Sequence, residues 1–233
     1  MNDKNRLIHK VKIIAHRGYS VDTFENSSEA FKLAANLPFW GIESDVHQTK
    51  DGIFVIHHDA NMKHTTGVDM QITSSTLDEL RALTYKGTNY KIVTFKEYLE
   101  ICMSHQKIAV IELKPFFTTP MIDQLLKIIK EYSYLSHCVF ISFEADNLLR
   151  LRAIAPAVKI QILVNKVDSI LINFCKEQNF DLNLDHIILT KELVEQLHNH
   201  QIHVNCWTIR NKDEANKYTD FGVDFITTDG FKE

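Results

Sequence analysis

The sequence predicts an α/β protein, a TIM (β/α)8 barrel with a small insertion after the second strand. Short runs rich in Val and Ile recur along the 233 residues, and amphipathic helical patterns lie between them. Such alternation favours a parallel sheet with right-handed crossovers. Eight predicted strands favour a closed barrel. An open doubly wound sheet is the alternative, although no glycine-rich phosphate loop follows the first strand.

Strands of a parallel sheet are buried on both faces, so they read as short apolar runs. The predicted strands are Val11–Ala15, Gly41–Val46, Ile108–Leu113, His137–Phe143, Lys159–Val164, His186–Leu189, His203–Thr208 and Asp224–Thr227. Helices are predicted where apolar residues recur every three or four positions. These are Asn26–Asn36, Thr94–Met103, Thr119–Tyr132, Ala145–Ile154, Val167–Gln178, Lys191–Asn199 and Lys212–Tyr218.

One stretch, residues 51–90, interrupts this alternation after the second strand. It begins with a predicted hairpin, because Asp51-Gly52 is a strong turn signal and Phe54–Ile56 is an apolar run. We interpret residues 51–90 as an insertion within a single barrel domain that spans residues 1–233. Its position is informative, because barrel active sites are assembled at the carboxyl ends of the strands.

The composition is that of an ordinary globular protein, with 45% hydrophobic and 24% charged residues. The net charge of -4 leaves no basic field, so we expect no nucleic-acid partner. The cysteines lie in apolar segments and are predicted to be buried free thiols. They are Cys102, Cys138, Cys175 and Cys206. The N-terminus resembles no secretory signal and no run of about 18 apolar residues occurs, so we expect a cytoplasmic location without stable membrane insertion.

Carboxylates occupy the ends of two predicted strands. Side chains alternate along a strand, so Glu43 and Asp45 share one face, as do Glu112 and Lys114. If that face points into the barrel, three carboxylates converge and need a cation to offset their repulsion. Oxygen ligands favour one hard divalent cation, Mg²⁺ or Ca²⁺. The alternative is that these carboxylates are surface charges.

Two histidines also lie near predicted strand ends. His16 closes the first strand and His58 follows the hairpin, and histidine both gives and takes protons near neutral pH. Arg17 and Lys114 offer cations that suit phosphate oxygens. Together these groups favour attack at phosphorus, where negative charge builds on the oxygens. His47 shares the face of Glu43 and is left open as a rim residue or a substrate contact.

These motifs, in this order, resemble the glycerophosphodiester phosphodiesterase family over nearly the whole chain. Each motif is weak alone, but the ordered set is specific. The motifs are Ala15–Gly18, Glu25-Asn26, Gly41–Val46, Thr49–Gly52, His58-Asp59, Thr65–Gly67, Ile111–Lys114, Ser142-Phe143, Trp207-Thr208, Gly222–Asp224 and Thr228-Asp229. The resemblance implies a TIM barrel with an insertion after the second strand.

The resemblance also implies roles for individual residues. The roles it implies are an acid–base pair of His16 and His58, metal ligands Glu43, Asp45 and Glu112, phosphate contacts Arg17 and Lys114, and a packing contact of Trp207 with the glycerol or leaving group. Trp207 can equally be a core residue. The implied mechanism begins with the glycerol 2-hydroxyl, which one histidine and the metal activate. This hydroxyl attacks phosphorus, the other histidine protonates the leaving alcohol, and water opens the cyclic phosphate.

The expected reaction therefore releases sn-glycerol 3-phosphate and an alcohol from a small-molecule glycerophosphodiester. A lysophospholipase D-type or other phosphodiesterase of the same superfamily and a non-catalytic phosphodiester-binding barrel remain alternatives. The sequence departs from the family pattern at Phe24, where Pro is usual, and at His64, where Arg is frequent. The chain ends soon after Asp229, so we expect a short or absent last helix and allow for a homodimer contact there.

Overall fold

The computed structural model describes residues 11–114 and 116–231, so the expectation for the N-terminal segment falls largely outside the described residues. Eight parallel strands in this part of the chain form the barrel. They are β1 (Lys12–Ala15), β2 (Gly41–Gln48), β5 (Ile108–Leu113), β6 (Cys138–Ser142), β7 (Lys159–Val164), β8 (Asp181–Asp185), β9 (Val204–Ile209) and β10 (Phe225–Thr228).

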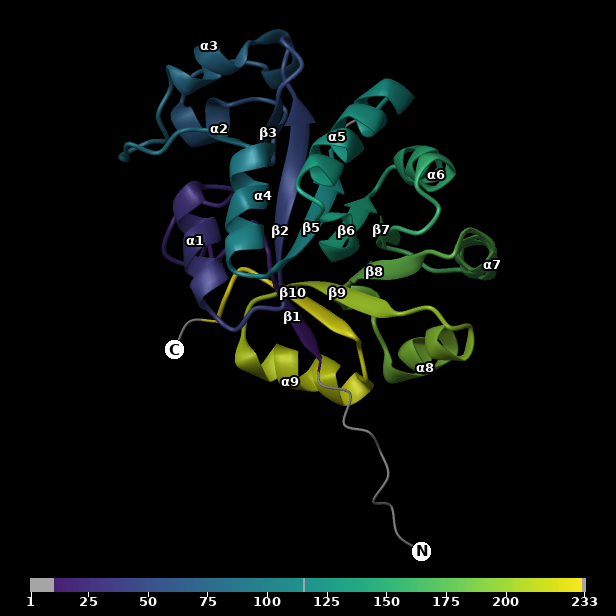
Figure 1. The fold of residues 1–233 in the computed structure, drawn as a ribbon. Helices are drawn as coiled ribbons and strands as arrows, with labels where there is room; N and C mark the ends of the chain where they lie inside the picture. The colour runs from purple at the N-terminus through teal and green to yellow at the C-terminus, as the bar shows by residue number, and fades with distance from the viewer. Residues whose placement is uncertain (1–10, 115, 232–233) are drawn as a thin grey trace, which may run out of the picture.

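The sheet closes on itself through β1. This strand pairs with β10 on one side, with Ile13 opposite Ile226, and with β2 on the other, with Ile14 opposite Gly41. Figure 1 shows the resulting ring of strands with helices around it. The closure confirms the predicted TIM barrel and rules out the open doubly wound sheet.

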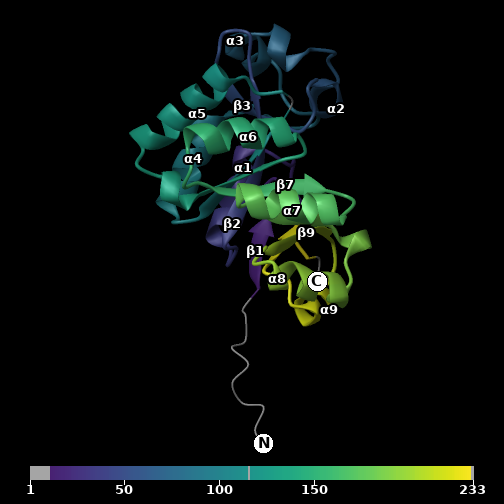
Figure 2. The same cartoon turned by 90° about the vertical axis from the view of Figure 1, so that its right-hand side faces the viewer.

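A helix follows each of the first seven barrel strands, directly or after an inserted segment, and returns the chain to the start of the next strand. The helices are α1 (Ser28–Asn36), α4 (Phe95–Ser104), α5 (Thr119–Glu131), α6 (Ala145–Ile154), α7 (Ser169–Gln178), α8 (Lys191–Asn199) and α9 (Lys212–Phe221). Hydroxyl side chains begin several of them; Ser27 accepts a hydrogen bond from the Ala30 N–H, for example. Figure 2 shows α5, α6 and α7 along one side of the barrel. Within the described residues, no helix is long and apolar enough to cross a membrane.

Two apolar layers hold the barrel together. The larger lies between the strands and the helices and contains all four cysteines, which are free and buried as predicted. The smaller fills the barrel interior and is built around Ile14, Val110, Val139, Ile141, Leu163 and Phe225. Polar side chains replace apolar ones in the interior toward the carboxyl ends of the strands. The apolar layers therefore fix the strands, and the polar end provides the site.

One predicted strand was wrong. The sequence placed it at His186–Leu189, but β8 is Asp181–Asp185 and residues His186–Ile188 form a short 3₁₀ helix, η3. In η3 the Ile187 side chain is 78% exposed. β8 reads Asp-Leu-Asn-Leu-Asp, so its polar side chains alternate with leucines and break the apolar run that identified the other strands.

The segment between β2 and α4 folds against the end of β2. Its first strand, β3 (Phe54–Ile56), pairs antiparallel with β2 and so forms the predicted hairpin. The other elements are α2 (Lys63–Thr66), the 3₁₀ helix η1 (Ile72–Ser74), α3 (Leu77–Arg81) and β4 (Val93–Thr94). Figure 1 shows α2 and α3 together to one side of β2, near its tip. They enclose a small apolar cluster of their own around Met62 and Tyr85.

Candidate active site

A cavity of about 360 Å³ lies at the carboxyl ends of the barrel strands. Its volume falls within the usual range for small-molecule sites. Seven of the eight sequence-predicted site residues line it, and the eighth, Asp45, is fully buried and paired with the cavity residue Lys114. The cavity is lined by His16, Arg17, Glu25, Glu43, His58, Glu112, Lys114, Ile141, Phe143, Leu163, Asn183, Trp207, Thr208, Arg210, Thr227 and Asp229.

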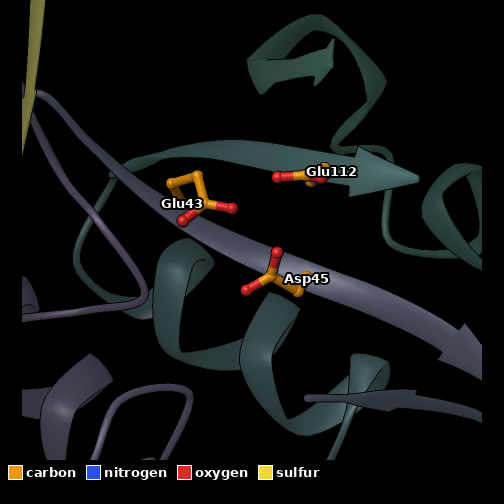
Figure 3. A group of neighbouring side chains, drawn as sticks. All are labelled: Glu43, Asp45 and Glu112. Atoms are coloured by element: carbon orange, nitrogen blue, oxygen red, sulfur yellow. The ribbon is translucent and has the colours of Figure 1, made fainter. Parts of the chain in front are cut away.

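The three predicted metal ligands come together. Glu43 and Asp45 project from β2 and Glu112 from the adjacent β5, as Figure 3 shows. One oxygen of each lies within 4.8 Å of the others, and all three side chains are buried. The register explains this cluster. Asp45 stands directly opposite Glu112 in the sheet, and Glu43 lies two positions before Asp45 and therefore on the same face of the strand.

The cluster has the properties of a cation site. Glu43 Oε1 and Asp45 Oδ1 are buried without a hydrogen-bond partner. Burial and the neighbouring carboxylates raise the pKa of Glu43 well above its usual value. Burial and the charge of Asp45 likewise raise the pKa of Glu112 to about 7. Without a cation the cluster therefore tends to hold protons, and a hard divalent cation fits the same oxygen donors.

Asp45 behaves differently from its two neighbours. Burial opposes its ionisation, but the charges of Lys114 and Arg17 outweigh burial and hold the pKa of Asp45 at about 2. Lys114 Nζ lies 3.4 Å from Asp45 Oδ1 and 2.9 Å from Glu112 Oε1. The Asn26 amide donates a hydrogen bond of 2.7 Å to Asp45 Oδ2. Asp45 is therefore ionised near neutral pH, and its negative charge is paired with Lys114 and Arg17.

Arg17 is held by an unusual backbone. Its φ of 55° is in the left-handed region, and the following Gly18 has φ of 84°. This turn directs the Arg17 N–H to Glu43 Oε2, at 2.9 Å. The guanidinium donates to both oxygens of Glu25, at 2.8 and 2.9 Å, and its Nε lies 3.3 Å from Asp45. Positive φ outside glycine costs energy and often marks a functional site.

Both predicted catalytic histidines have a carboxylate partner at Nδ1. His16 Nδ1 lies 2.6 Å from Asp229 Oδ1, and His58 Nδ1 lies 2.8 Å from Asp59 Oδ1. Among the described residues, neither Nε2 atom has a hydrogen-bond partner. A carboxylate at Nδ1 fixes the tautomer and the ring orientation, and it leaves Nε2 for proton transfer.

Trp207 lines the same cavity as the two histidines, Glu43 and Glu112. Its indole N–H donates to the Asn183 carbonyl oxygen at 3.2 Å, and its ring meets Phe143 edge-to-face at 5.7 Å. Its polar edge is therefore satisfied within the protein. The exposed part of the ring faces the cavity, so Trp207 can offer an apolar surface to a ligand.

His47 and His64 lie outside this cavity. His47 is buried, burial lowers its pKa to about 4, and its Nε2 lies 3.2 Å from the His58 carbonyl oxygen. It therefore supports the backbone of His58. His64 lines a neighbouring pocket of about 520 Å³ that shares Glu25, Arg210 and Asp229 with this cavity.

Several residues of the site carry roles that the sequence did not assign. Glu25, Asn26, Asp59 and Asp229 stand in the quoted motifs, but only the structure shows that they pair with Arg17, Asp45, His58 and His16 respectively. Their positions in the motifs were the available signal. Asn183 gave no signal, because it lies in the strand that the sequence misplaced.

The chain matches the model of the glycerophosphoryl diester phosphodiesterase family over residues 16–233. It is 31% identical over 233 residues to the glycerophosphodiester phosphodiesterase of Caldanaerobacter subterraneus subsp. tengcongensis, with 94% of each chain covered. It is 27% identical to the glycerophosphodiester phosphodiesterase of Bacillus altitudinis, again over 94% of each chain.

Solved structures give the same fold. A glycerophosphodiester phosphodiesterase from Thermotoga maritima superposes with a TM-score of 0.76 at 28% identity, covering 94% of both chains. A phosphodiesterase from Oleispira antarctica, solved in complex with the product sn-glycerol-3-phosphate, superposes with a TM-score of 0.86 at 24% identity, over 94% of this chain and 92% of that one.

Proposed function

Because the chain belongs to the glycerophosphoryl diester phosphodiesterase family and is a glycerophosphodiester phosphodiesterase, we propose that it uses a divalent cation and two histidines to release sn-glycerol 3-phosphate. One observation carries this proposal. Two histidines, each with a carboxylate at Nδ1, line the same cavity as Glu43 and Glu112, and Asp45 joins these two carboxylates in one buried cluster. The product found in the Oleispira structure agrees with a small-molecule substrate of this class.

Glu43, Asp45 and Glu112 would hold one cation, Mg²⁺ or Ca²⁺, because their ligand atoms are all carboxylate oxygens. When bound, the ion would offset negative charge on the phosphate oxygens and lower the pKa of a nearby hydroxyl. Arg17 and Lys114 neutralise part of the cluster and line the cavity beside it. They would bind the non-bridging phosphate oxygens, Arg17 through its planar fork and Lys114 as a point charge.

His16 and His58 would divide the proton transfers between them. The Nε2 of one accepts the proton of the glycerol 2-hydroxyl as its oxygen attacks phosphorus. The Nε2 of the other donates a proton to the departing alcohol oxygen, so a cyclic phosphate and a neutral alcohol result. Water then opens the cyclic phosphate with the two roles reversed. Trp207 would pack against the glycerol carbons.

Incubation of the purified protein with glycerophosphocholine or glycerophosphoethanolamine tests the proposal. Sn-glycerol 3-phosphate is measured with Mg²⁺, with Ca²⁺ and with EDTA. We expect release with at least one ion and none in EDTA. Glu43→Ala should abolish the metal-dependent activity without unfolding the chain, and His58→Ala should retain the ion but lose about 10²–10⁴-fold in rate. Full activity of both variants would refute the assigned roles.

Two further expectations stay predictions. A homodimer would be detected by sedimentation equilibrium of the purified chain. A cytoplasmic location, consistent with a role in glycerol and lipid metabolism, would be tested by cell fractionation.

A further inference from the structure

The catalytic cavity has two chemically different sides. The histidines, the carboxylates and both phosphate-binding cations lie on β2 and β5 and in the segments that follow β1, β3, β5 and β10. The lining residues on β6 to β9, and the residue after β6, are uncharged. They are Ile141, Phe143, Leu163, Asn183, Trp207 and Thr208. Arg210, directly after β9, is charged, but its Nε lies 3.6 Å from Asp229 Oδ2, so it belongs with the first side. A bound phosphate and cation belong on the first side, so the second side must contact the uncharged part of a substrate.

Asn183 stands out on the uncharged side. It projects from β8, beside Leu163 on β7, and only 2% of its surface is exposed. Its Oδ1 atom is buried without a hydrogen-bond partner, and among the described residues its side chain makes no hydrogen bond at all. An unsatisfied buried amide is costly, so a native protein rarely retains one without a reason.

The neighbouring amides differ from Asn183 in this respect. Asn205, opposite it on β9, donates to Gln161 Oε1 at 3.1 Å and accepts from the Thr227 hydroxyl at 3.1 Å. The barrel interior thus satisfies one of two adjacent asparagines internally. The other, Asn183, lines the catalytic cavity with its hydrogen-bonding capacity unused.

The departing alcohol has another place to lie. The neighbouring pocket of about 520 Å³ shares Glu25, Arg210 and Asp229 with the catalytic cavity, and these residues follow β1, β9 and β10 respectively. An alcohol leaving from a phosphate held by Arg17 can extend into that pocket. The uncharged side around Asn183 is then left for the glycerol part of the substrate.

We propose that the Asn183 carboxamide binds the free primary hydroxyl of the substrate's glycerol, and so selects deacylated glycerophosphodiesters over substrates with a substituted hydroxyl. The inference rests on the proposed function, in which the 2-hydroxyl is the nucleophile and the primary hydroxyl is the group farthest from phosphorus. A hydroxyl both donates and accepts, so it satisfies the Asn183 oxygen or nitrogen in either amide orientation. An acylated oxygen lacks the proton and adds bulk against a wall of Leu163 and Trp207.

The test compares two substrates and two proteins. The substrates are glycerophosphocholine and its analogue with hydrogen in place of the primary hydroxyl, which retains the nucleophilic 2-hydroxyl. The proteins are the wild type and Asn183→Leu, which keeps the side-chain shape but removes its hydrogen bonding. In the wild type, loss of the substrate hydroxyl should lower kcat/KM about 10–100-fold. Asn183→Leu should lower kcat/KM for glycerophosphocholine similarly and change that for the analogue by less than about threefold.

Asn183→Ala provides a second variant that adds no apolar bulk, and it should show the same selective loss. Circular dichroism and thermal unfolding would establish that both variants are folded. Equal losses on both substrates in both folded variants, or a wild type that does not distinguish the substrates, would overturn the role of Asn183. A wild type that hydrolyses neither substrate with Mg²⁺ or Ca²⁺ would instead overturn the proposed function, and this proposal with it.

Discussion

His16 Nδ1 lies 2.6 Å from Asp229 Oδ1, although 213 positions separate the two residues in the chain. The contact exists because β1 and β10 are adjacent and parallel, with Ala15 opposite Thr228, so both residues follow the same edge of the barrel. Barrel closure therefore supplies His16 with the carboxylate that orients it. Despite burial, the hydrogen bond with His16 lowers the pKa of Asp229, so the carboxylate is ionised near neutral pH.

Asp229→Asn should lower kcat about 10–100-fold, because a hydrogen bond to a charged group contributes about 1.5–3 kcal/mol. The amide has nearly the same shape, so the variant should fold normally and lose mainly ring orientation and charge. Steady-state kinetics with glycerophosphocholine measure the effect. The control is Asp220→Asn on the exposed face of α9. Unchanged kcat in Asp229→Asn would show that His16 needs no carboxylate partner.

The raised pKa of Glu112 predicts how stability depends on pH in the absence of metal. Its pKa is about 7 in the folded chain against 4.5 for an ordinary glutamate. The folded state therefore keeps a proton that the unfolded state releases, and this contribution to stability is lost as pH rises from 4.5 to 7. Glu112→Gln mimics the protonated form, so its free energy of unfolding should rise relative to wild type across that interval.

Chemical denaturation in EDTA at several pH values measures this difference. Burial lowers the pKa of His47 to about 4, so the contribution of His47 to the free energy of unfolding increases with pH. This contribution is the same in wild type and Glu112→Gln, so it cancels when the two proteins are compared. Saturating Mg²⁺ or Ca²⁺ should reduce or reverse the difference, because it binds the ionised carboxylate of the wild type. Glu195→Gln on the exposed face of α8 is the control. A pH-independent difference for Glu112→Gln would contradict the assignment.

Gly18 should tolerate no side chain. A Cβ there would lie 2.7 Å from the Ala30 carbonyl carbon, within the helix α1, and φ is 84°. Gly222 is a matched control, because its φ is 88° but a Cβ would meet nothing within 4 Å. Gly222→Ala should cost about 1–2 kcal/mol from its backbone alone. Gly18→Ala should cost about 1–3 kcal/mol more. Urea unfolding tests this, and equal losses would contradict the close approach.

Most of the barrel could be predicted because parallel strands are buried on both faces and so are strongly apolar. The same rule failed where the interior is polar. β8 alternates polar and apolar residues because Asn183 faces the cavity, whereas the apolar segment that replaced it in the prediction is the exposed η3. The strand that the sequence misplaced, β8, is thus one that carries a buried polar atom without a hydrogen-bond partner, Asn183 Oδ1.

The site followed a similar pattern. That His16, His58 and the three carboxylates lie close together could be predicted from their positions near strand ends and their alternation. Their partners could not, because Asp229 reaches His16 only through closure of the barrel, and Asn26 reaches Asp45 only through the turn at Arg17 and Gly18. Periodicity within one strand carries no information about contacts between distant strands.

Metal binding measured together with activity tests the central claim most directly. Calorimetric titration of metal-free protein with Mg²⁺ or Ca²⁺ should show one site per chain, and release of sn-glycerol 3-phosphate should follow its occupancy. Asp45→Asn should fold but lose both the heat of binding and the activity, because Asp45 is the ionised member of the cluster. Release that continues undiminished in EDTA, or ion binding that persists in Asp45→Asn, would contradict the account.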